Sequence, residues 1–550
     1  MRAVWASSFA VFVGLLALGC SSPTSGPATT PATQSSPAST TPKFTVTYDP
    51  NGATAGTAPV DTGSYAQGGR FTVLGSGTLS KAGSFFSGWN TAQGGGGTAF
   101  VAGNSANMGG VNLVLYAQWG PAYTVTYNAG VVTSGTSPVD GAGHGANTSV
   151  TVMGSGSMVK TGYALAGWTT SLTGPGSSYA ASASFTMGSS NVDLYPVWIP
   201  NNLTFSSFGA NIYLTGSTSL SGSQLDIPAG VTGISGSFTS NSTVTDVSIP
   251  ASVTYIGTSP FSSFYNLLTI SVDAANTAYQ SISGVLLNKA GTSLVEVPMT
   301  FTSYAIPSTV TTIEGNAFFD GHITTINIPS NVQTVSGQAF MFCPLTSLTI
   351  SSGLTKIGLA AFGSTNITTV NLPASVSSID GRPFYGCLHL SSISVDSGNP
   401  YFVSQAGVLF DHAGTTLIEA PGAISGAYVV PGTVRTIADE AFSSCSLLTA
   451  ITITSGVTTI GIQAFAYCSG LTAISLPSSI ASIKETAFYD CSSLTSLTME
   501  NSSPPALPAN TNVFVAEASG FKIHLPSIAA ITTYSGTSGW SDYSGIFVTP

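Results

Sequence analysis

Hydrophobic positions in the C-terminal half of the chain return at a fixed spacing. Segments 448–470 (LTAITITSGVTTIGIQAFAYCSG) and 471–493 (LTAISLPSSIASIKETAFYDCSS) match at six positions, each 23 residues apart. Apolar and polar residues alternate early in each copy, as at Leu471, Ile474 and Leu476, which is typical of a strand with one buried face. A second apolar pair and an Ala-Phe turn follow. One such unit cannot bury its own apolar face, so the pattern predicts stacked coils.

The same unit recurs along most of residues 200–500. It is found wherever Ile or Val is followed five residues later by Phe, with steps of 22 or 23 residues and two longer steps of 57 and 58. The two long steps are themselves copies, because segment 272–298 returns 123 residues later as segment 395–421. We expect each to add a hairpin-bearing coil and a half to the stack. The Phe residues of the series are Phe261, Phe318, Phe340, Phe362, Phe384, Phe442, Phe465 and Phe488.

This unit resembles the BspA-like leucine-rich repeat. The resemblance rests on Leu-x-x-Ile-x-Leu-Pro at the strand and Ala-Phe-x-x-Cys at the turn, as in 471–477 and 487–491. It implies a solenoid over residues 200–500, displayed on a bacterial surface for adhesion to host, matrix or other cells.

Residues 44–198 hold a second repeat of 79 residues. Its two copies, 44–119 and 123–198, each open on an alternating strand, pass through Gly-Trp (Trp89, Trp168) and close on Leu-Tyr-x-x-Trp. The copies resemble the Listeria-Bacteroides repeat, the internalin-type B repeat, which implies small β-grasp-like modules that act as spacers. The two tryptophans are interpreted as core residues; a glycan-binding role is the alternative.

The two ends of the chain differ in character. Residues 1–20 combine an early Arg2 with a short apolar run that ends on Cys20, which is typical of an export signal. The last residues of this segment, up to Cys20, resemble a lipoprotein signal, which implies lipid on the Cys20 sulfur. An ordinary secretory peptide is the alternative. Residues 21–43 are almost entirely Ser, Thr, Pro, Ala and Gly, and predict a tether. Residues 501–550 lose the period and predict a cap over the last coil.

Composition narrows the class of function. Charged residues make up only 6% of the chain, and the net charge is −10. A nucleic-acid binder needs a basic surface, so that class is excluded. Electrostatic attachment to anionic lipid is disfavoured for the same reason, which leaves the N-terminal lipid as the expected membrane contact.

Residues that could carry chemistry are few and scattered. Five cysteines (Cys343, Cys387, Cys445, Cys468, Cys491) each follow a repeat Phe by three positions, so they share one register and are expected to be buried thiols rather than disulfides. The five histidines have no ligand-spaced partner, and no nucleophile motif occurs. We expect neither an enzyme nor a cofactor.

The sequence therefore predicts a mainly β protein: two small β-grasp-like modules, then a leucine-rich-repeat solenoid with a C-terminal cap. Its outward strand positions are mostly Ser, Thr and Asn. The candidate ligand contacts are the turn aromatics Tyr385, Tyr467 and Tyr489 and the strand residues Asn327 and Asn371. We expect a lipid-anchored surface protein that binds an extracellular protein or matrix ligand. A self-associating envelope protein without an external ligand is the alternative.

Overall fold

The computed structural model describes residues 41–174, 176–508, 512–515 and 517–549. The expected signal peptide, Cys20 and most of the tether lie outside these residues. The chain forms two compact units: the first holds residues up to Lys81 together with Phe86–Trp119, and the second holds Ala82–Phe85 and the chain from Gly120 onward. Each unit is described by itself below.

The first unit is the first repeat module. Its core sheet has the strand order β2-β8-β5-β6, in which β2 and β8 run parallel. Trp89 packs edge-on against Tyr48 at 4.6 Å, and its indole N–H donates to the Leu74 carbonyl. The strands are β1 Lys43–Phe44, β2 Val46–Asp49, β3 Tyr65–Ala66, β4 Arg70–Thr72, β5 Ser84–Asn90, β6 Ala99–Phe100, β7 Ser105–Asn107 and β8 Leu113–Pro121.

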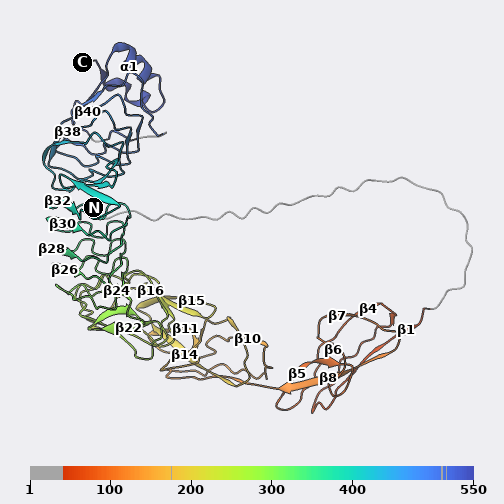
Figure 1. Cartoon of the computed structure of the whole chain (residues 1–550). Helices are drawn as coiled ribbons and strands as arrows, with labels where there is room; N and C mark the ends of the chain where they lie inside the picture. The colour runs from red at the N-terminus through yellow and green to blue at the C-terminus, as the bar shows by residue number, and fades with distance from the viewer. Residues whose placement is uncertain (1–40, 175, 509–511, 516, 550) are drawn as a thin grey trace, which may run out of the picture. The chain divides into compact units, whose positions relative to one another are not determined.

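The second module repeats this sheet in the order β12-β11-β14-β9. Its strands β11 and β14 are labelled in Figure 1. Trp168 is fully buried and donates its indole N–H to the Met153 carbonyl. Both repeat tryptophans are therefore core residues, and neither indole face is available to stack on a sugar. The strands are β9 Val125–Tyr127, β10 Ser149–Thr151, β11 Tyr163–Thr169, β12 Ser178–Tyr179, β13 Ser184–Thr186 and β14 Val192–Pro200.

The second module shares a hydrophobic core with the first coils of the solenoid. Val197 and Ile199 of β14 are buried in one cluster with Ile212 and Leu214. Gly230 lies so close to β14 that a Cβ there would meet the Val197 side chain at 2.3 Å. A solenoid needs its apolar ends covered. The second module covers the N-terminal end of the solenoid.

The two modules differ in sequence at this contact. The positions of Val197 and Ile199 in the second module are held by Gln118 and Gly120 in the first. The first module therefore lacks the apolar pair that joins the second module to the solenoid.

Replacing Val197 by Gln is expected to lower the free energy of unfolding by about 2 kcal/mol, because the amide would be buried without a partner. Hydrogen exchange should rise in the hairpin that faces this module, β15 Leu203–Phe208 and β16 Asn211–Ser217. Gln118→Val is the matched control and should stay within about 0.5 kcal/mol of the parent. Equal losses in both variants would contradict a specific contact at β14.

The solenoid coil has two strands and a turn, and successive coils stack parallel, as seen from green to blue in Figure 1. The longer strand in each coil alternates buried and exposed residues, as in β26 and β40. The long strands are β17 Gln224–Asp226, β19 Asp246–Ile249, β21 Thr269–Val272, β26 Thr325–Ile328, β28 Ser347–Ile350, β30 Thr369–Leu372, β32 Ser392–Val395, β36 Gly426–Val429, β38 Leu448–Thr452, β40 Ala473–Leu476, β42 Ser496–Met499, β43 Lys522–His524 and β44 Phe547–Val548.

The other strand of each coil belongs to a second row of strands, which we call the short-strand row. This row begins with the hairpin of β15 and β16 and continues through shorter strands. These are β15 Leu203–Phe208, β16 Asn211–Ser217, β18 Gly233–Ile234, β20 Tyr255–Ile256, β24 Ser293–Glu296, β25 Thr312–Ile313, β27 Thr334–Val335, β29 Lys356–Ile357, β31 Ser378–Ile379, β35 Thr416–Glu419, β37 Thr436–Ile437, β39 Thr459–Ile460 and β41 Ser482–Ile483.

The two long repeat steps form hairpins that divide the solenoid core. The first consists of β22 Tyr279–Ile282 and β23 Val285–Asn288, and the second of β33 Phe402–Gln405 and β34 Val408–Asp411. In β23, Leu286 joins the core before the hairpin, whereas its neighbours Val285 and Leu287 join the core after it. The strand is buried on both faces, so it separates two blocks of coils. We call these two places the first and second junctions.

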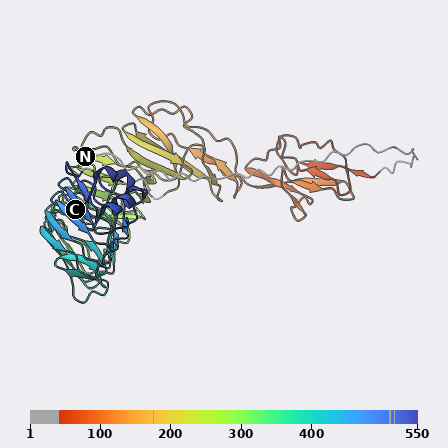
Figure 2. The same cartoon turned by 90° about the horizontal axis from the view of Figure 1, so that it is seen from above.

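The C-terminal residues cover the last coils. The helix α1 Ile528–Ser535 begins at Ser527, whose side chain accepts from the Ala530 N–H, and a 3-10 turn, η1 Ser541–Ile546, follows. Tyr534 and Trp540 are fully buried, in edge contact at 4.9 Å. Figure 2 shows this segment in dark blue from above. The strand β43 pairs parallel with β42, so this segment continues the stack beyond the last repeat.

Candidate functional site

One side of the solenoid is built from the Ala-Phe-x-x-Cys turns, and we call it the turn side. Buried Phe rings stack along it, with Phe465 lying 5.2 Å from Phe442 and 5.3 Å from Phe488 between ring centroids. In the coil of Phe465, Gln463 and Tyr467 both have positive φ, at 53° and 61°. These conformations are unfavourable for residues other than glycine. They recur two positions before and after the Phe in most coils.

Hydrogen bonds between coils hold these turns. The Phe465 N–H donates to the Ala487 carbonyl of the next coil at 2.8 Å, and the Tyr467 N–H donates to the Tyr489 carbonyl at the same distance. The residue two positions after the Phe is thereby fixed with its side chain outward. Phe342 and Tyr467 hold this position in their coils and are 48% and 41% exposed.

The five repeat cysteines are buried free thiols, as their shared register predicts. Cys468 donates its S–H to the Phe442 carbonyl of the preceding coil at 3.1 Å, and Cys491 does the same to the Phe465 carbonyl. Burial raises the pKa of the Cys491 thiol to about 12. A thiol in this state is neutral and unreactive at physiological pH, so the cysteines stabilise the turns and do not act as nucleophiles.

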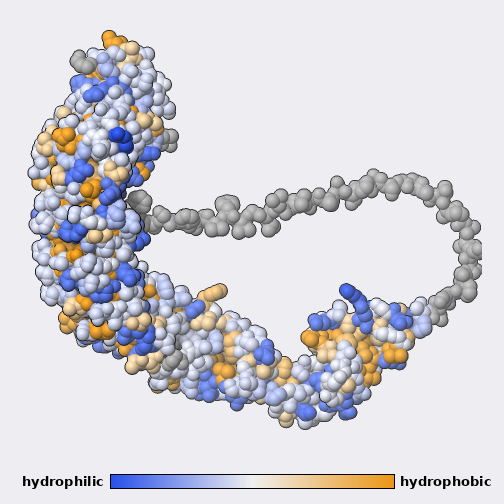
Figure 3. Space-filling view, in the orientation of Figure 1, coloured by the Kyte–Doolittle hydropathy of each residue, from blue (hydrophilic) through white to orange (hydrophobic). Residues whose placement is uncertain are grey.

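Large apolar side chains are exposed along the turn side. They come from coils on both sides of the second junction, and each is between 41% and 54% exposed. We call this set the turn-side apolar strip: Phe342, Leu359, Leu388, Leu447, Ile462 and Tyr467. Figure 3 shows one face of the molecule, where orange patches interrupt a pale solenoid surface that carries few deep blue atoms.

The predicted turn aromatics lie on this side. Tyr467 and Tyr489 are in edge contact, with ring centroids 5.6 Å apart. Tyr385 is half-buried, and the guanidinium of Arg382 lies 5.5 Å from its ring centroid. The structure thus brings two of the three tyrosines into contact.

The predicted asparagines lie on the outward face of the long strands, away from the tyrosines. Asn327 is exposed and lines a hollow of about 520 Å³ together with Tyr304, Ser347 and Thr349. Asn371 is two coils further on and accepts a hydrogen bond from Ser394 at 2.9 Å. They share a face but do not form one site. The contact roles of all five predicted residues stay predictions.

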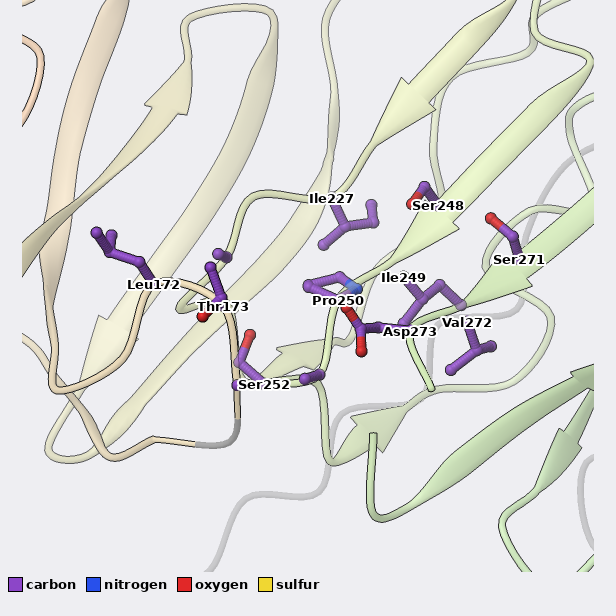
Figure 4. A pocket seen from close by; sticks show the side chains of 13 residues that line it. Leu172, Thr173, Ile227, Ser248, Ile249, Pro250, Ser252, Ser271, Val272 and Asp273 are labelled. Atoms are coloured by element: carbon purple, nitrogen blue, oxygen red, sulfur yellow. The ribbon is translucent and has the colours of Figure 1, made fainter. Parts of the chain in front are cut away.

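A second hollow of about 420 Å³ lies where the second module meets the solenoid. Figure 4 shows Leu172 and Thr173 of a module loop on one side and the strands that carry Ser248 and Ser271 on the other. The only charged side chain among its lining residues is Asp273, whose carboxylate accepts from the Ala275 N–H. Sequence reasoning could not find this hollow, because two segments distant in the chain form it.

Each junction holds a buried glutamate. In ordinary coils, the N–H of the repeat Phe donates to a carbonyl of the next coil, but a hairpin replaces that coil at a junction. At the first junction, the Phe261 N–H donates to Glu296 Oε1 at 3.1 Å instead. Burial raises the pKa of Glu296 to about 8. The carboxyl therefore holds a proton at neutral pH.

The second junction adds a cation. Arg382 Nε lies 3.4 Å from Glu419 Oε1, and its Nη2 donates to the Ser443 carbonyl at 3.2 Å. Burial raises the pKa of Glu419 to about 7, and Arg382 opposes that rise. The sequence does signal that these two glutamates have the same role, because Glu296 and Glu419 occupy the same place in the two long steps.

The described residues contain neither a metal-binding cluster nor a membrane-spanning helix. No group of three or more His, Cys, Asp or Glu side chains in that part of the chain could hold a metal ion. None of the described helices has the length and apolar character needed to span a bilayer.

Comparison with known families matches both repeats. The BspA type leucine-rich repeat region matches residues 197–283, 297–406 and 427–516, in six copies that cover just over half of the chain. The chain belongs to the BspA-type leucine-rich repeat family. The Listeria-Bacteroides repeat domain matches residues 44–118 and 123–197. Both resemblances drawn from the sequence are confirmed, as is the mainly β fold.

Individual relatives are similar over parts of their length. A protein of Evansella cellulosilytica, described as a Gly-rich membrane protein, is 33% identical over 175 residues, which are 30% of this chain and 20% of that protein. A second membrane protein of that organism is 42% identical over 76 residues, 14% of this chain and 11% of its own length. The chain thus spans about a fifth or less of the relatives it matches.

Solved structures of this type are also similar. The pneumococcal vaccine antigen PcpA is 21% identical, with a TM-score of 0.39 over 64% of this chain and 97% of that one. A leucine-rich cell surface protein from Faecalibacterium prausnitzii is 22% identical, with a TM-score of 0.39 over 62% of this chain and 98% of that one.

Proposed function

We propose that this chain is a lipid-anchored surface protein whose solenoid binds an extracellular protein through the turn-side apolar strip. The observation that carries the proposal is that strip, in a chain with only 6% charged residues. Exposed apolar side chains that gather on one side of a molecule are typical of protein contact sites. Aromatic residues are enriched at the centres of such interfaces, and the strip includes Phe342 and Tyr467.

The backbone geometry of the turn side supports this role. The exposed ring of Tyr467 is held by a positive φ and by hydrogen bonds to the next coil, and it leans on Tyr489. Side chains fixed before binding lose little entropy when a partner docks. The long-strand face offers small hydroxyl and amide groups instead, which contribute less to protein interfaces.

The test is binding of the full chain to a panel of immobilised extracellular matrix proteins. A turn-side variant, Leu447→Asp with Ile462→Asp and Tyr467→Ala, should lose affinity by about 100-fold or more, because hot-spot losses are 2 kcal/mol or larger. The long-strand control changes three exposed residues, Thr325→Asp, Ser347→Asp and Thr349→Asp, and should bind like the parent. A loss in the control alone would contradict the proposal.

Self-association is the competing function. Sedimentation of the parent chain alone measures it directly. Oligomers that disappear in the turn-side variant, without binding to any panel protein, would replace the proposed ligand with a second copy of the chain.

The lipid anchor is proposed on Cys20. Replacing Cys20 by Ser is expected to move the protein from the membrane fraction to the medium, because the acyl chains on Cys20 are the proposed membrane anchor. Incorporation of labelled fatty acid should be lost as well. Labelled lipid that remains in Cys20→Ser would contradict the assignment.

A further inference from the structure

Acidic residues gather on the turn side beyond the second junction. The three consecutive coils of Phe442, Phe465 and Phe488 hold four of the 21 acidic residues of the chain within three positions of their Phe. These four residues are Asp439, Glu440, Glu485 and Asp490. No Lys or Arg occurs at the same positions of these coils, and Lys484 lies one position further out. The turns of these coils therefore carry net negative charge.

The acids share their registers with the turn-side apolar strip. Three positions before the Phe, successive coils hold Asp439, Ile462 and Glu485, and all three side chains are exposed. The Asp439 carboxylate accepts from the Ile462 N–H at 2.7 Å, and the Gln463 N–H donates to the Glu485 carbonyl at 3.1 Å. An exposed apolar residue thus has an acid on either side of it along the stack.

A second register continues this surface. Two positions after the Phe, Tyr467 is followed in the next coil by Asp490. Burial raises the pKa of Tyr467, and the neighbouring Tyr489, Tyr385 and Asp490 raise it further. Tyr385 belongs to the coil that precedes the second junction, so the surface around Tyr467 extends across that junction.

Most of the acids on this surface have no cation beside them. In the part of the chain that the structure describes, none of the ion pairs includes Asp439, Glu485 or Asp490, whereas Glu440 lies 4.0 Å from Arg382. Interfaces pair a negative surface with a positive one. A partner that covers these turns must therefore combine apolar side chains with Lys or Arg.

The spacing of the coils selects the secondary structure that fits along them. The Phe465 ring lies 5.2 Å and 5.3 Å from the rings of the neighbouring coils, and outside them Tyr467 and Tyr489 are 5.6 Å apart. An α-helix advances about 5.4 Å per turn, so a helix parallel to the stack presents one residue to each coil. A strand repeats one face only every 6.8 Å or about that distance, and would leave the register of the coils.

We infer that the strip beyond the second junction binds a basic amphipathic α-helix of another protein, laid parallel to the stack of coils. The inference rests on the proposed function, because it names the partner of the same strip. An apolar residue of the helix packs on Ile462, and a Lys or Arg one turn before and one turn after it pairs with Asp439 and Glu485. Among the described residues the one α-helix is α1, which has no charged residue, so a second copy does not supply this helix.

The test is fluorescence anisotropy of three labelled peptides of about 18 residues, titrated with the full-length chain at low ionic strength. The first peptide consists of Leu and Lys in a helical period, the second of Leu and Glu in the same period, and the third of Leu and Lys in strict alternation. We expect the first peptide to bind about tenfold or more tightly than either of the others. Equal binding by the first peptide and either of the others, or no binding, would overturn the inference.

Two variants with the same change of net charge locate the contact. The acid variant neutralises three turn residues, Asp439→Asn, Glu485→Gln and Asp490→Asn. The charge control neutralises three acids outside the turn side, Asp193→Asn, Asp226→Asn and Asp246→Asn. The acid variant should bind the helical Leu/Lys peptide about tenfold more weakly and with less dependence on salt, because screened charge pairs are lost. The charge control should bind like the parent, and an equal loss in the two variants would overturn the inference.

The panel of matrix proteins separates this inference from the proposed function. A panel protein that binds the parent and the acid variant equally, but not the turn-side variant, would keep the strip as the binding site and overturn the basic helix as its partner. Panel binding that the turn-side substitutions leave unchanged would contradict the proposed function, and the peptide comparison would then decide the inference by itself.

Discussion

Replacing Phe465 by Ala is expected to lower the free energy of unfolding by about 3–5 kcal/mol. The ring is fully buried and stacked on both sides, at 5.2 Å from Phe442 and 5.3 Å from Phe488. The coils of a solenoid contact only their neighbours, so a cavity at one coil weakens both of its interfaces. We therefore expect the block that follows the second junction to unfold before the rest.

Urea denaturation followed by hydrogen exchange measures this effect. Tyr467→Ala is the matched control, because it removes an aromatic ring from the same coil at an exposed position, and its cost should stay below about 1 kcal/mol. A loss for Phe465→Ala no larger than for Tyr467→Ala would contradict the stacked core.

Replacing Arg382 by Leu is expected to cost about 3–5 kcal/mol at pH 8, because it leaves Glu419 buried without its cation. The pKa of Glu419 should then rise from about 7 toward that of Glu296, about 8. A carboxyl with a raised folded-state pKa binds more protons folded than unfolded. The contribution of this carboxyl to the stability of the folded protein is greatest below its unfolded-state pKa of 4.5. That contribution is lost as the pH rises through the folded-state pKa.

The cost of Arg382→Leu should therefore be level from pH 4.5 to about 7 and grow between about pH 7 and 8, measured by urea denaturation across that range. The control combines Arg382→Leu with Glu419→Gln, which removes the titrating group but keeps an acceptor. Its stability should vary less with pH than that of the single variant. The same pH slope in both variants would contradict the role of Glu419.

Repetition explains why so much of the fold could be predicted. Every coil makes the same contacts with its neighbours, so the positions of Phe465 and Cys468 in one unit fix those of their counterparts along the stack. The position of the three tyrosines on the turns could be predicted for the same reason. The exposure of Tyr467 follows from a positive φ set by backbone hydrogen bonds between coils, which no residue pattern in a single copy expresses.

The junctions could be predicted only in part. The hairpins were expected, but the burial of β23 on both of its faces was not, and its signal was three successive apolar residues, Val285, Leu286 and Leu287. The contact of Arg382 with Glu419 joins residues 37 positions apart through a hairpin. Local sequence does not specify such a pairing.

The joining of the second module to the solenoid had a signal in the sequence. Val197 and Ile199 are apolar where the first module has Gln118 and Gly120. This difference indicates an apolar face of the second module that is buried against another part of the chain. A cut after residue 198 would expose that face. Fragments 41–119 and 120–550 follow the two compact units instead.

Binding of these two fragments to the matrix panel is the most direct test of the proposal that the solenoid is the binding part of the chain. We predict that fragment 120–550 binds a panel protein with the affinity of the full chain, that the turn-side variant of this fragment does not, and that fragment 41–119 shows no binding. Binding carried by fragment 41–119 alone, or binding by 120–550 that the turn-side substitutions leave unchanged, would contradict the account.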